Sequence, residues 1–237
     1  MANQWVIPDI HGCSKTLMKL IEDKIQPQKE DTLYFLGDYI DRGPDSKGVI
    51  DYLMSLENKG YHLKCLMGNH EEYLIKALNH EYLYERMLNL NLNRYKHAWL
   101  EYGGKECLSS FGVKYLKSIP SRYIDWIKEL VLYFVMTDYV LVHAGLNFQK
   151  KDPFEDKSTM LSVRDYEIIP EIIDNRIIIH GHVPVHIDFI ELSIKKENSL
   201  FIDLDNGVYM TNREGFGKLT ALELKSKKLL TQDNIDL

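Results

Sequence analysis

The sequence predicts an α/β protein in which a largely parallel sheet, covered by helices, is followed by further strands in a mixed arrangement. Over about the first third of the chain, short apolar segments alternate with amphipathic ones, which is typical of strands separated by covering helices. Later apolar segments at 131–136 and 139–142 flank Thr137-Asp138 and predict a hairpin. No linker or low-complexity tract interrupts the chain, so we expect one domain over residues 1–237.

The expected elements of the first third follow the order β-α-β-α-β-α. Each expected strand is a short apolar run that ends at a glycine-flanked polar cluster. We expect Ser14 to cap the first helix, Ser46 to start the second, and the third to run through Leu78. The expected strands of the whole chain lie at 5–7, 32–36, 63–67, 131–136, 139–142, 177–179, 200–202 and 219–224.

Residues 79–118 are rich in Tyr, Asn and Leu and predict a helical cap, helical up to Gly103-Gly104. Its aromatic and basic side chains would suit stacking on a nucleobase. They equally suit a packed helical subdomain, which is the interpretation that we favour. The side chains concerned are Tyr82, Tyr84, Arg94, Tyr95, His97 and Trp99.

Composition favours a soluble enzyme or binding protein without a nucleic-acid partner. Hydrophobic residues make up 45% of the 237 residues and charged residues 27%, which is ordinary for a globular protein. The formal net charge of -6 offers no general field for polyanions, so an anionic substrate needs a local cluster or a metal. No signal peptide and no apolar run of about 20 residues is present, and three widely spaced cysteines indicate free thiols. We therefore expect a cytoplasmic protein without a membrane partner.

Polar side chains gather where the expected strands end. The motif GDYIDRG at 37–43 follows one strand and places two carboxylates and a guanidinium within five residues. In open α/β sheets ligands bind outside the carboxyl ends of strands, so such clusters can converge. Carboxylate, imidazole and amide groups together suit Mn, Fe or Zn better than Ca or Mg. The residues are Asp9, His11, Asp38, Asp41, Arg42, Asn69, His70, His143, His180 and His182.

Each cluster also has a structural alternative. An Asp-x-His after a strand is often a turn capped by its own side chains, Asp38 and Asp41 can be caps with Arg42 as a surface partner, and His143 can be a core histidine. Five clusters at five strand ends favour a shared site over five unrelated ones.

In this order, PDIHG, GDYIDRG, GNHE, HAG and GHVP resemble the motif series of the phosphoprotein phosphatase family of dinuclear metallophosphatases, over residues 5–207. The pattern is most similar to the small bacterial and phage branch, which includes symmetrical dinucleoside tetraphosphate hydrolases, and WLEYGG at 99–104 resembles an element of that branch. The resemblance implies a calcineurin-like metallophosphoesterase domain. Its four-layer fold has a central β-sandwich of mixed sheets flanked by helices, with metals at the carboxyl ends of strands.

The resemblance also implies a role for each matched residue. Two metal ions, with manganese favoured and iron or zinc as alternatives, would share a hydroxide that attacks phosphorus directly. His70 would protonate the leaving oxygen, Asp41 would orient His70, and Arg42, Asn69 and Arg164 would hold the phosphate. The metal ligands would be Asp9, His11, Asp38, Asn69, His143 and His182.

Several positions remain open. Arg164 matches the family's second arginine, although an ion pair with Asp165 or Glu167 is the alternative. His180 would either support a ligand or pack in a strand. Asp203 would position His70 or a ligand loop, whereas a turn role is favoured for Asp205. Pro8 stands where the family commonly has Gly, and the segment 209–217 is longer than the family's usual link.

Three functions fit the motifs. The favoured one is a serine/threonine protein phosphatase, the second is a symmetrical dinucleoside tetraphosphate hydrolase, and the third is an inactive metal-binding scaffold. The substrate would accordingly be a phosphoprotein or a nucleotide polyphosphate. Because every matched ligand and the acid are present, the scaffold ranks last.

Overall fold

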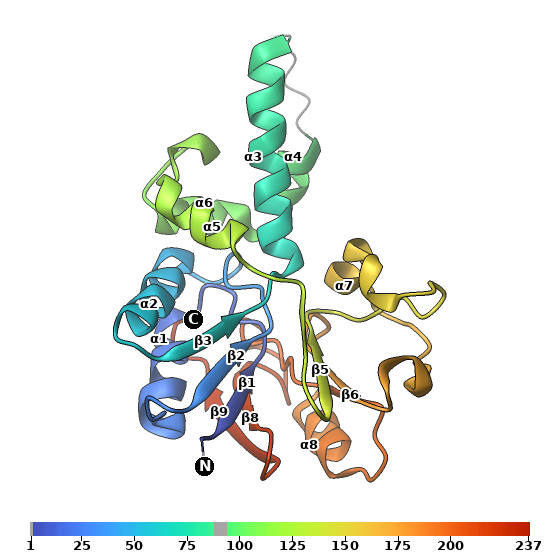
Figure 1. Cartoon of the computed structure of the whole chain (residues 1–237). Coiled ribbons are helices and arrows are strands. Elements are labelled where there is room, and N and C mark those ends of the chain that lie inside the picture. The colour runs from blue at the N-terminus through green and yellow to red at the C-terminus, as the bar shows by residue number, and fades with distance from the viewer. Residues whose placement is uncertain (1, 88–93) are drawn as a thin grey trace.

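Two sheets stacked face to face form the centre of the molecule (Figure 1). The computed structural model describes residues 2–87 and 94–237. The first sheet has the order β3-β2-β1-β8-β9 and the second the order β4-β5-β6-β7. This arrangement confirms the predicted mixed sandwich with helices on its outer faces.

The first sheet joins the predicted parallel strands to two antiparallel ones from the end of the chain. The strand β1 pairs in parallel with β2, and β2 with β3, whereas β8 runs antiparallel to both β1 and β9. A crossover helix connects each parallel pair, as parallel strands require. The bounds are β1 Gln4–Ile7, β2 Thr32–Phe35, β3 His62–Cys65, β8 Lys218–Glu223 and β9 Lys228–Asp233.

The second sheet opens with the predicted hairpin. Its strands β4 and β5 are antiparallel, and β5, β6 and β7 are parallel. The parallel strands of both sheets therefore deliver their carboxyl ends to a common region. The bounds are β4 Tyr133–Val135, β5 Tyr139–Val142, β6 Ile177–His180 and β7 Phe201–Asp203.

Alternation along the strands assigns each side chain to one of three apolar clusters. Trp5 and Ile7 face the helices, whereas Val6 between them faces the other sheet. In β5, Leu141 faces the first sheet while Val140 and Val142 face outward. This period of two is what a strand imposes, and it separates the two sheets into the layers that lie side by side in Figure 1.

Helices cover the outer faces of the sandwich. On the first sheet lie α1 (Ser14–Lys19), the adjoining π-helical turn Leu20–Ile25 and α2 (Ser46–Asn58). On the outer face of the second sheet lie α7 (Lys157–Ser162) and the 3-10 turns Pro153–Glu155 and Pro170–Ile173. The helix α8 (Ile187–Lys195) instead packs Ile190 and Ile194 into the cluster between the two sheets.

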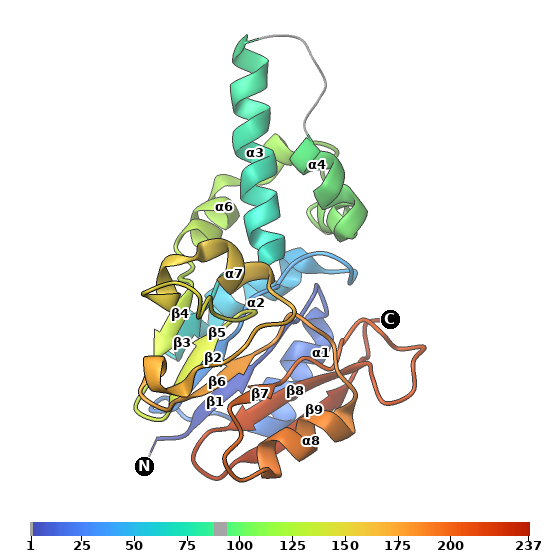
Figure 2. The ribbon, with the colours of Figure 1, turned by 90° about the vertical axis from the view of Figure 1, so that its right-hand side faces the viewer.

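A helical cap stands above the carboxyl ends of the strands. The helix α3 (Asn69–Met87) projects from the body with α4 (Arg94–Trp99) beside it (Figures 1 and 2). The expected helical stretch does not end at Gly103-Gly104. It turns there, because Gly103 has a φ of 110°, and continues. The remaining pieces are the π-helical turn Leu100–Gly104, α5 (Lys105–Ser110), the 3-10 turn Leu116–Ser118 and α6 (Ser121–Lys128).

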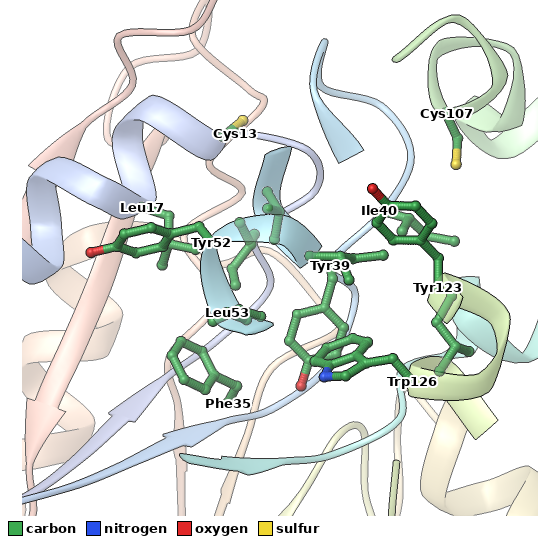
Figure 3. Close-up of a cluster of buried hydrophobic side chains, with 14 of the residues drawn as sticks. Cys13, Leu17, Phe35, Tyr39, Ile40, Tyr52, Leu53, Cys107, Tyr123 and Trp126 are labelled. Carbon is green, nitrogen blue, oxygen red and sulfur yellow. The ribbon is translucent and has the colours of Figure 1, made fainter. Parts of the chain in front are cut away.

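The core beneath this cap contains part of the GDYIDRG motif. Tyr39 is fully buried and meets Trp126 edge to face at 5.2 Å between ring centroids (Figure 3). Its hydroxyl donates a hydrogen bond to the Leu66 carbonyl over 2.9 Å. The tyrosine thus ties the motif turn to the end of β3.

One expectation about an element end is wrong, and one strand was missed. Ser14 is the first residue of α1 rather than its cap, and its hydroxyl bonds to Asp45 over 2.7 Å. The strand β9 was not predicted, because most of its residues are exposed or only partly buried and its pairing with β8 defines it. The free cysteines agree with the prediction. Among the described residues, no helix combines the length and apolar character that crossing a bilayer requires.

Candidate active site

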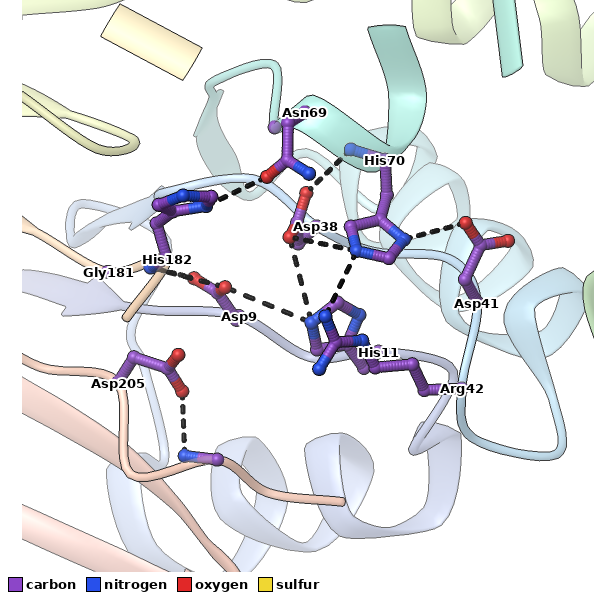
Figure 4. A network of polar contacts seen from close by, with 12 residues as sticks. Asp9, His11, Asp38, Asp41, Arg42, Asn69, His70, Gly181, His182 and Asp205 are labelled. Atoms are coloured by element: carbon purple, nitrogen blue, oxygen red, sulfur yellow. Dashed lines mark hydrogen bonds and ion pairs between the residues drawn. The ribbon is translucent and has the colours of Figure 1, made fainter. Parts of the chain in front are cut away.

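Side chains from both sheets meet at the carboxyl ends of the parallel strands (Figure 4). The first sheet contributes residues that follow β1 and β2 and those that begin α3, and the second contributes residues that follow β5 and β6. The sequence-predicted residues that come together are Asp9, His11, Asp38, Asp41, Arg42, Asn69, His70, His143 and His182.

Two groups of potential metal ligands share Asp38. In one group His11, Asp38 and His70 offer donor atoms within 4.8 Å of one another, and in the other Asp38 does so with His143 and His182. One carboxylate oxygen faces each side, since Asp38 Oδ2 lies 3.6 Å from His11 Nε2 and Oδ1 lies 3.6 Å from His143 Nε2. This is the geometry of a carboxylate that can bridge two cations.

Asp9 lies between the same two imidazoles. Its Oδ2 is 3.9 Å from His11 Nε2, its Oδ1 is 4.0 Å from His143 Nδ1, and both oxygens accept the backbone N–H of His182. Asp9 is therefore fixed beside both ligand groups.

The tautomers of two imidazoles follow from their backbone partners. His143 Nδ1 lies 2.9 Å from the Leu36 carbonyl, and His11 Nδ1 lies 3.0 Å from the Ile40 carbonyl. Because a carbonyl only accepts, each Nδ1 carries the proton and each Nε2 has a free lone pair. Both lone pairs then point toward carboxylate oxygens. Without a cation the lone pairs and the oxygens repel each other, whereas a cation bound between them would attract both.

Asn69 adds a further converging acceptor. Its Oδ1 lies 2.9 Å from both His143 Nε2 and His182 Nδ1. Among the described residues, His182 Nε2 is buried without a hydrogen-bond partner. Lone pairs and oxygens crowded together in this way fit the mixed N/O shell of a transition metal.

Burial and mutual repulsion shift the pKa values of these groups. Burial, and then neighbouring Asp205 and Asp38, hold the pKa of Asp9 well above its usual value, and burial raises the pKa of Asp38 to about 7. Burial lowers the pKa of His143 to about 3 and keeps it neutral. A bound divalent cation would invert this balance for the carboxylates.

His70 stands at the edge of the ligand groups, held by a carboxylate. Its Nδ1 lies 2.7 Å from Asp41 Oδ2, and the other oxygen of Asp41 accepts the Trp99 indole N–H over 3.1 Å. The opposite nitrogen, His70 Nε2, accepts from the Arg42 guanidinium over 3.4 Å and lies 3.8 Å from Asp38. Burial, and then the Arg42 charge, lower the pKa of His70 well below its usual value.

Tyr209 supports this edge from the extended loop after β7. The Arg42 guanidinium lies 4.2 Å from the centre of the Tyr209 ring, and the ring meets His11 edge to face at 5.1 Å. Tyr209 belongs to no expected cluster, so its contacts with Arg42 and His11 were not predicted.

Five site residues without the freedom of glycine adopt left-handed backbone conformations. Their φ values are 46° for His11, 50° for Asp38, 71° for Asp41, 66° for Arg42 and 73° for His182. Such conformations cost about 1–3 kcal/mol each and persist where the surroundings impose them. Their concentration here separates the site from an ordinary set of turns.

Glu71 imposes the conformation of one of these turns. Its buried carboxylate accepts four backbone N–H groups, from Gly68 and from the three consecutive residues Asp38, Tyr39 and Ile40. The final Glu of GNHE is therefore an anchor for the motif that precedes it. Glu71 was not predicted to have a role, although its position as the last residue of the GNHE motif could have indicated one.

The remaining expected residues lie around the site. Arg164 is exposed after α7, and among the described residues no ion pair joins it to Asp165 or Glu167. Burial lowers the pKa of His182, and the charges of His143 and then Arg164 contribute to the shift. Asp205 accepts from Gly207 N over 2.7 Å, the turn role expected of it.

Asp203 and His180 lie on the side of the site away from His70. Asp203 accepts the Asp205 N–H, and among the described residues no hydrogen bond joins it to His70. Of its two expected roles, positioning a loop is the one that fits. His180 packs against Phe201 with its Nδ1 3.0 Å from the Gly181 carbonyl. Of the two roles expected for His180, packing in a strand agrees with the structure better than support of a ligand.

The aromatic residues of the cap divide into two groups. Trp99 is fully buried and Tyr95 packs against the first apolar cluster, as a packed subdomain requires, whereas Arg94 and His97 are exposed. The rings near the site are instead Tyr102 and Tyr73, since Tyr102 lies 6.2 Å from His70 and 5.5 Å from Tyr73 between centroids. The side chains of Tyr82 and Tyr84 lie outside the described residues.

Comparison with known families decides the class of this site. The family model described as calcineurin-like phosphoesterase matches residues 3–231. The chain belongs to the calcineurin-like phosphoesterase family. It is accordingly a metallophosphoesterase, a hydrolase of a family that uses divalent metal ions, and the Asp and His groups described above could hold them.

Curated relatives match the first part of this phosphoesterase. A "Bis(5'-nucleosyl)-tetraphosphatase, symmetrical" of Buchnera aphidicola subsp. Schizaphis graminum is 42% identical over 71 residues, which are 30% of this chain and 25% of that protein. The protein of the same name from Legionella pneumophila (strain Corby) is 39% identical over 74 residues, 31% and 26% of the two chains. The matched segments thus span about a quarter of these relatives' own length.

Solved structures share the fold over the whole chain. A putative diadenosine tetraphosphatase has a TM-score of 0.57 at 17% identity, covering 97% of this chain and 92% of that one. A serine/threonine phosphatase from Saccharomyces cerevisiae has a TM-score of 0.61 at 18% identity, covering 100% and 81%. At these identities the likeness shows the metallophosphoesterase fold alone.

Proposed function

We propose that the protein hydrolyses symmetrical dinucleoside tetraphosphates at a centre of two divalent metal ions. The observation that carries the proposal is the pair of potential ligand groups that share Asp38. His70 belongs to one of these groups, but its Nδ1 is held by Asp41, so we assign it to proton transfer and not to a metal. The ligands would be Asp9, His11, Asp38, Asn69, His143 and His182. The convergence of lone pairs and carboxylate oxygens there supports a mixed N/O metal shell.

Bound divalent ions would supply polarisation of the phosphoryl oxygens and activation of the attacking water. Manganese suits this donor set, as do iron and zinc. The protein's part is to orient the phosphate and to handle the proton of the leaving oxygen.

His70 is the proposed proton donor. Its Nδ1 is committed to Asp41 over 2.7 Å, so the proton that it exchanges with substrate is on Nε2, the nitrogen that faces Asp38 and Arg42. The Asp41 carboxylate stabilises the charged imidazole while that proton is present. Because Trp99 holds the other oxygen of Asp41, the orientation of His70 is fixed before substrate binds.

Arg42, Arg164 and Asn69 are the proposed phosphate-binding residues. Arg42 is stacked on Tyr209 with its guanidinium beside His70 Nε2, so its N–H groups can reach oxygens of a phosphate at the ligand groups. A guanidinium binds such oxygens in a bidentate manner and offsets their charge in the transition state. Arg164 approaches from the side of His182.

The choice of substrate rests on the curated relatives. Those that match this chain are named for symmetrical dinucleoside tetraphosphates, whereas the serine/threonine phosphatase resembles it in fold only. The nucleotide substrate is therefore better supported than the phosphoprotein substrate that the motifs alone favoured. The proposal extends from a segment of those relatives to the whole of this chain.

The test is a kinetic comparison of diadenosine tetraphosphate with phosphoserine and phosphothreonine peptides, with Mn, Fe or Zn added. We expect a higher kcat/KM for the dinucleotide and ADP as its product. A higher kcat/KM for the peptides would overturn the choice of substrate without affecting the proposed site.

Two substitutions test the site itself. We expect Asp38→Asn to abolish hydrolysis because it removes the shared carboxylate charge, and His70→Asn to lower kcat by about 10²–10⁴-fold as the loss of a general acid does. His62→Asn is the matched control, because His62 is an exposed residue of β3. Hydrolysis at the wild-type rate in either site variant would contradict the proposed roles.

A further inference from the structure

A cavity of about 230 Å³ adjoins the proposed phosphate site on its second-sheet side. It lies among the ends of β6 and β7, the helix α8 and the segment 163–168 that follows α7. Two of its lining residues, Ala144 and Val183, are the immediate neighbours of the proposed ligands His143 and His182. The cavity is therefore directly adjacent to the proposed metal centre.

Aromatic rings line much of this cavity. The Phe201 ring lies 5.6 Å from His180 and 6.4 Å from Phe189 between centroids, with both pairs tilted by 33°. Apolar side chains such as Val185 and Ile168 complete the wall. Flat rings and branched aliphatic groups are the surfaces against which a planar heterocycle packs.

Tyr166 forms another wall and carries an unused polar group. Its hydroxyl is buried and has no hydrogen-bond partner among the described residues. The ring stacks on Phe148 with an interplanar angle of 6°, and a Cβ on Gly145 would lie 2.3 Å from it. The glycine of the HAG motif therefore admits the ring, and Tyr166 brings an unsatisfied hydroxyl to the wall of the cavity.

Two further polar groups face the same space. His180 Nδ1 carries a proton because it bonds to the Gly181 carbonyl, which leaves Nε2 as an acceptor. Asp203 lines the cavity, and one of its oxygens is used by the Asp205 N–H. One hydroxyl and two acceptors among aromatic walls match a base that carries both ring nitrogens and an exocyclic amine.

Arg164 connects the cavity to the phosphate site. Its side chain lines the cavity, and its charge acts on His182. A ligand with a phosphate at the metals and a ring in the cavity would pass this guanidinium. At about 230 Å³ the space is below the roughly 300–1,000 Å³ of pockets for drug-sized ligands, so it accommodates one ring system rather than a whole dinucleotide.

We propose that this cavity binds one purine base of the nucleotide substrate, with Tyr166 as a specificity-determining residue. The inference rests on the proposed function, since it supplies the base-recognition site for that substrate. A phosphoseryl or phosphothreonyl side chain, in contrast, carries no ring that could pack between these aromatic walls.

The test measures binding without turnover. Calorimetry compares α,β-methylene-ADP with methylenediphosphonate in the presence of Mn, two non-hydrolysable ligands that differ by the nucleoside. We expect the nucleotide to bind at least about tenfold more tightly, the equivalent of about 1.4 kcal/mol. Equal affinity for the two ligands would overturn the proposal.

Two variants test whether the tighter binding of the nucleotide depends on this cavity. Tyr166→Phe removes only the hydroxyl and should weaken nucleotide binding by about three- to tenfold, as the loss of one hydrogen bond does. Ile168→Trp fills the cavity and should make the two ligands bind equally. Ile172→Trp is the matched control, because Ile172 is 39% exposed and does not line the cavity. All three should bind methylenediphosphonate as the wild type does.

The outcomes separate this inference from the proposed function. If diadenosine tetraphosphate is hydrolysed but neither variant changes nucleotide affinity, the base lies elsewhere and the inference is wrong. The variants at Tyr166 and Ile168 could also lower the affinity for α,β-methylene-ADP relative to methylenediphosphonate although diadenosine tetraphosphate is not hydrolysed. In that case the cavity is a base-binding site and the proposed substrate is wrong. Ile168→Trp could unfold the protein, and in that case Tyr166→Phe alone decides.

Discussion

At the scale of single residues, Nδ1 partners decide which imidazole nitrogen is free. The Leu36 carbonyl engages His143, the Ile40 carbonyl engages His11, and Asp41 engages His70, each at Nδ1. In all three rings Nε2 is therefore the nitrogen without a proton, and in His70 it accepts from Arg42. The sequence predicted these histidines and the pairing of Asp41 with His70. It did not predict the tautomers of His11 and His143, because a backbone carbonyl partner can be any residue type.

Trp99 shows the same limit of sequence reasoning and offers a test. Its indole N–H is the partner of Asp41 Oδ1, so Trp99→Phe should leave the ring packing and loosen Asp41. We expect kcat to fall by about tenfold, the scale of one hydrogen bond to a charged group, with KM nearly unchanged. The measurement is a full kinetic profile on diadenosine tetraphosphate.

Trp126→Phe is the control for that variant. Trp126 is also buried, and its indole N–H bonds to Glu57, away from the site. It should lose stability without losing kcat. Equal kcat losses in both variants would mean that Trp99 acts through packing and not through Asp41.

At the scale of elements, the site depends on short turns held by distant partners. The turn after β2 is fixed by the Glu71 carboxylate at the start of α3 and approached by Gly103 from the cap. The sequence predicted the strand before this turn and the helix after it. It could not predict the left-handed residues between them, because Asp38 and Arg42 adopt that conformation only under these contacts.

Gly103 supplies a prediction at this scale. It has a φ of 110°, and a Cβ there would lie 2.3 Å from the backbone nitrogen of Arg42. Gly103→Ala should therefore displace the Arg42 turn and lower kcat/KM by up to about 10²-fold, as misplacement of a catalytic group by about 1 Å does. Thermal unfolding measured in parallel should also show a loss of stability.

Gly112→Ala separates backbone strain from steric displacement. Gly112 also has a positive φ, of 65°, but a Cβ there meets nothing within 4 Å. We expect a cost of about 1–2 kcal/mol and full activity. Normal kinetics in Gly103→Ala would mean that the cap does not position the Arg42 turn.

At the scale of the whole molecule, residues near the end of the chain complete elements near its beginning. The strand β8 extends the sheet at β1, and Asp236 accepts the backbone N–H groups of Lys15 and Thr16 at the start of α1. That helix has no cap from its own preceding residue, Cys13. Periodicity predicted the parallel half of the fold, but these pairings are long-range and leave no local pattern.

Asp236 can be tested as a cap supplied from a distance. Asp236→Ala should lower the free energy of unfolding by about 0.5–2 kcal/mol, the usual cost of losing an N-cap, as measured by urea denaturation. Asp233→Ala is the control, because Asp233 is paired with Lys218 at an exposed position, and should cost under about 1 kcal/mol. Equal losses would show that Asp236 acts only as a surface charge.

The ligand groups also set an order of events during synthesis. Asp9 and the backbone of His182 meet although 173 residues separate them, and Asp38 is shared between the ligand groups of both sheets. A nascent chain that has exposed only its first sheet segment offers an incomplete set of donors. A complete set of donors therefore forms late in translation, after the second sheet has emerged, and a chain on a stalled ribosome would lack a complete phosphoesterase site.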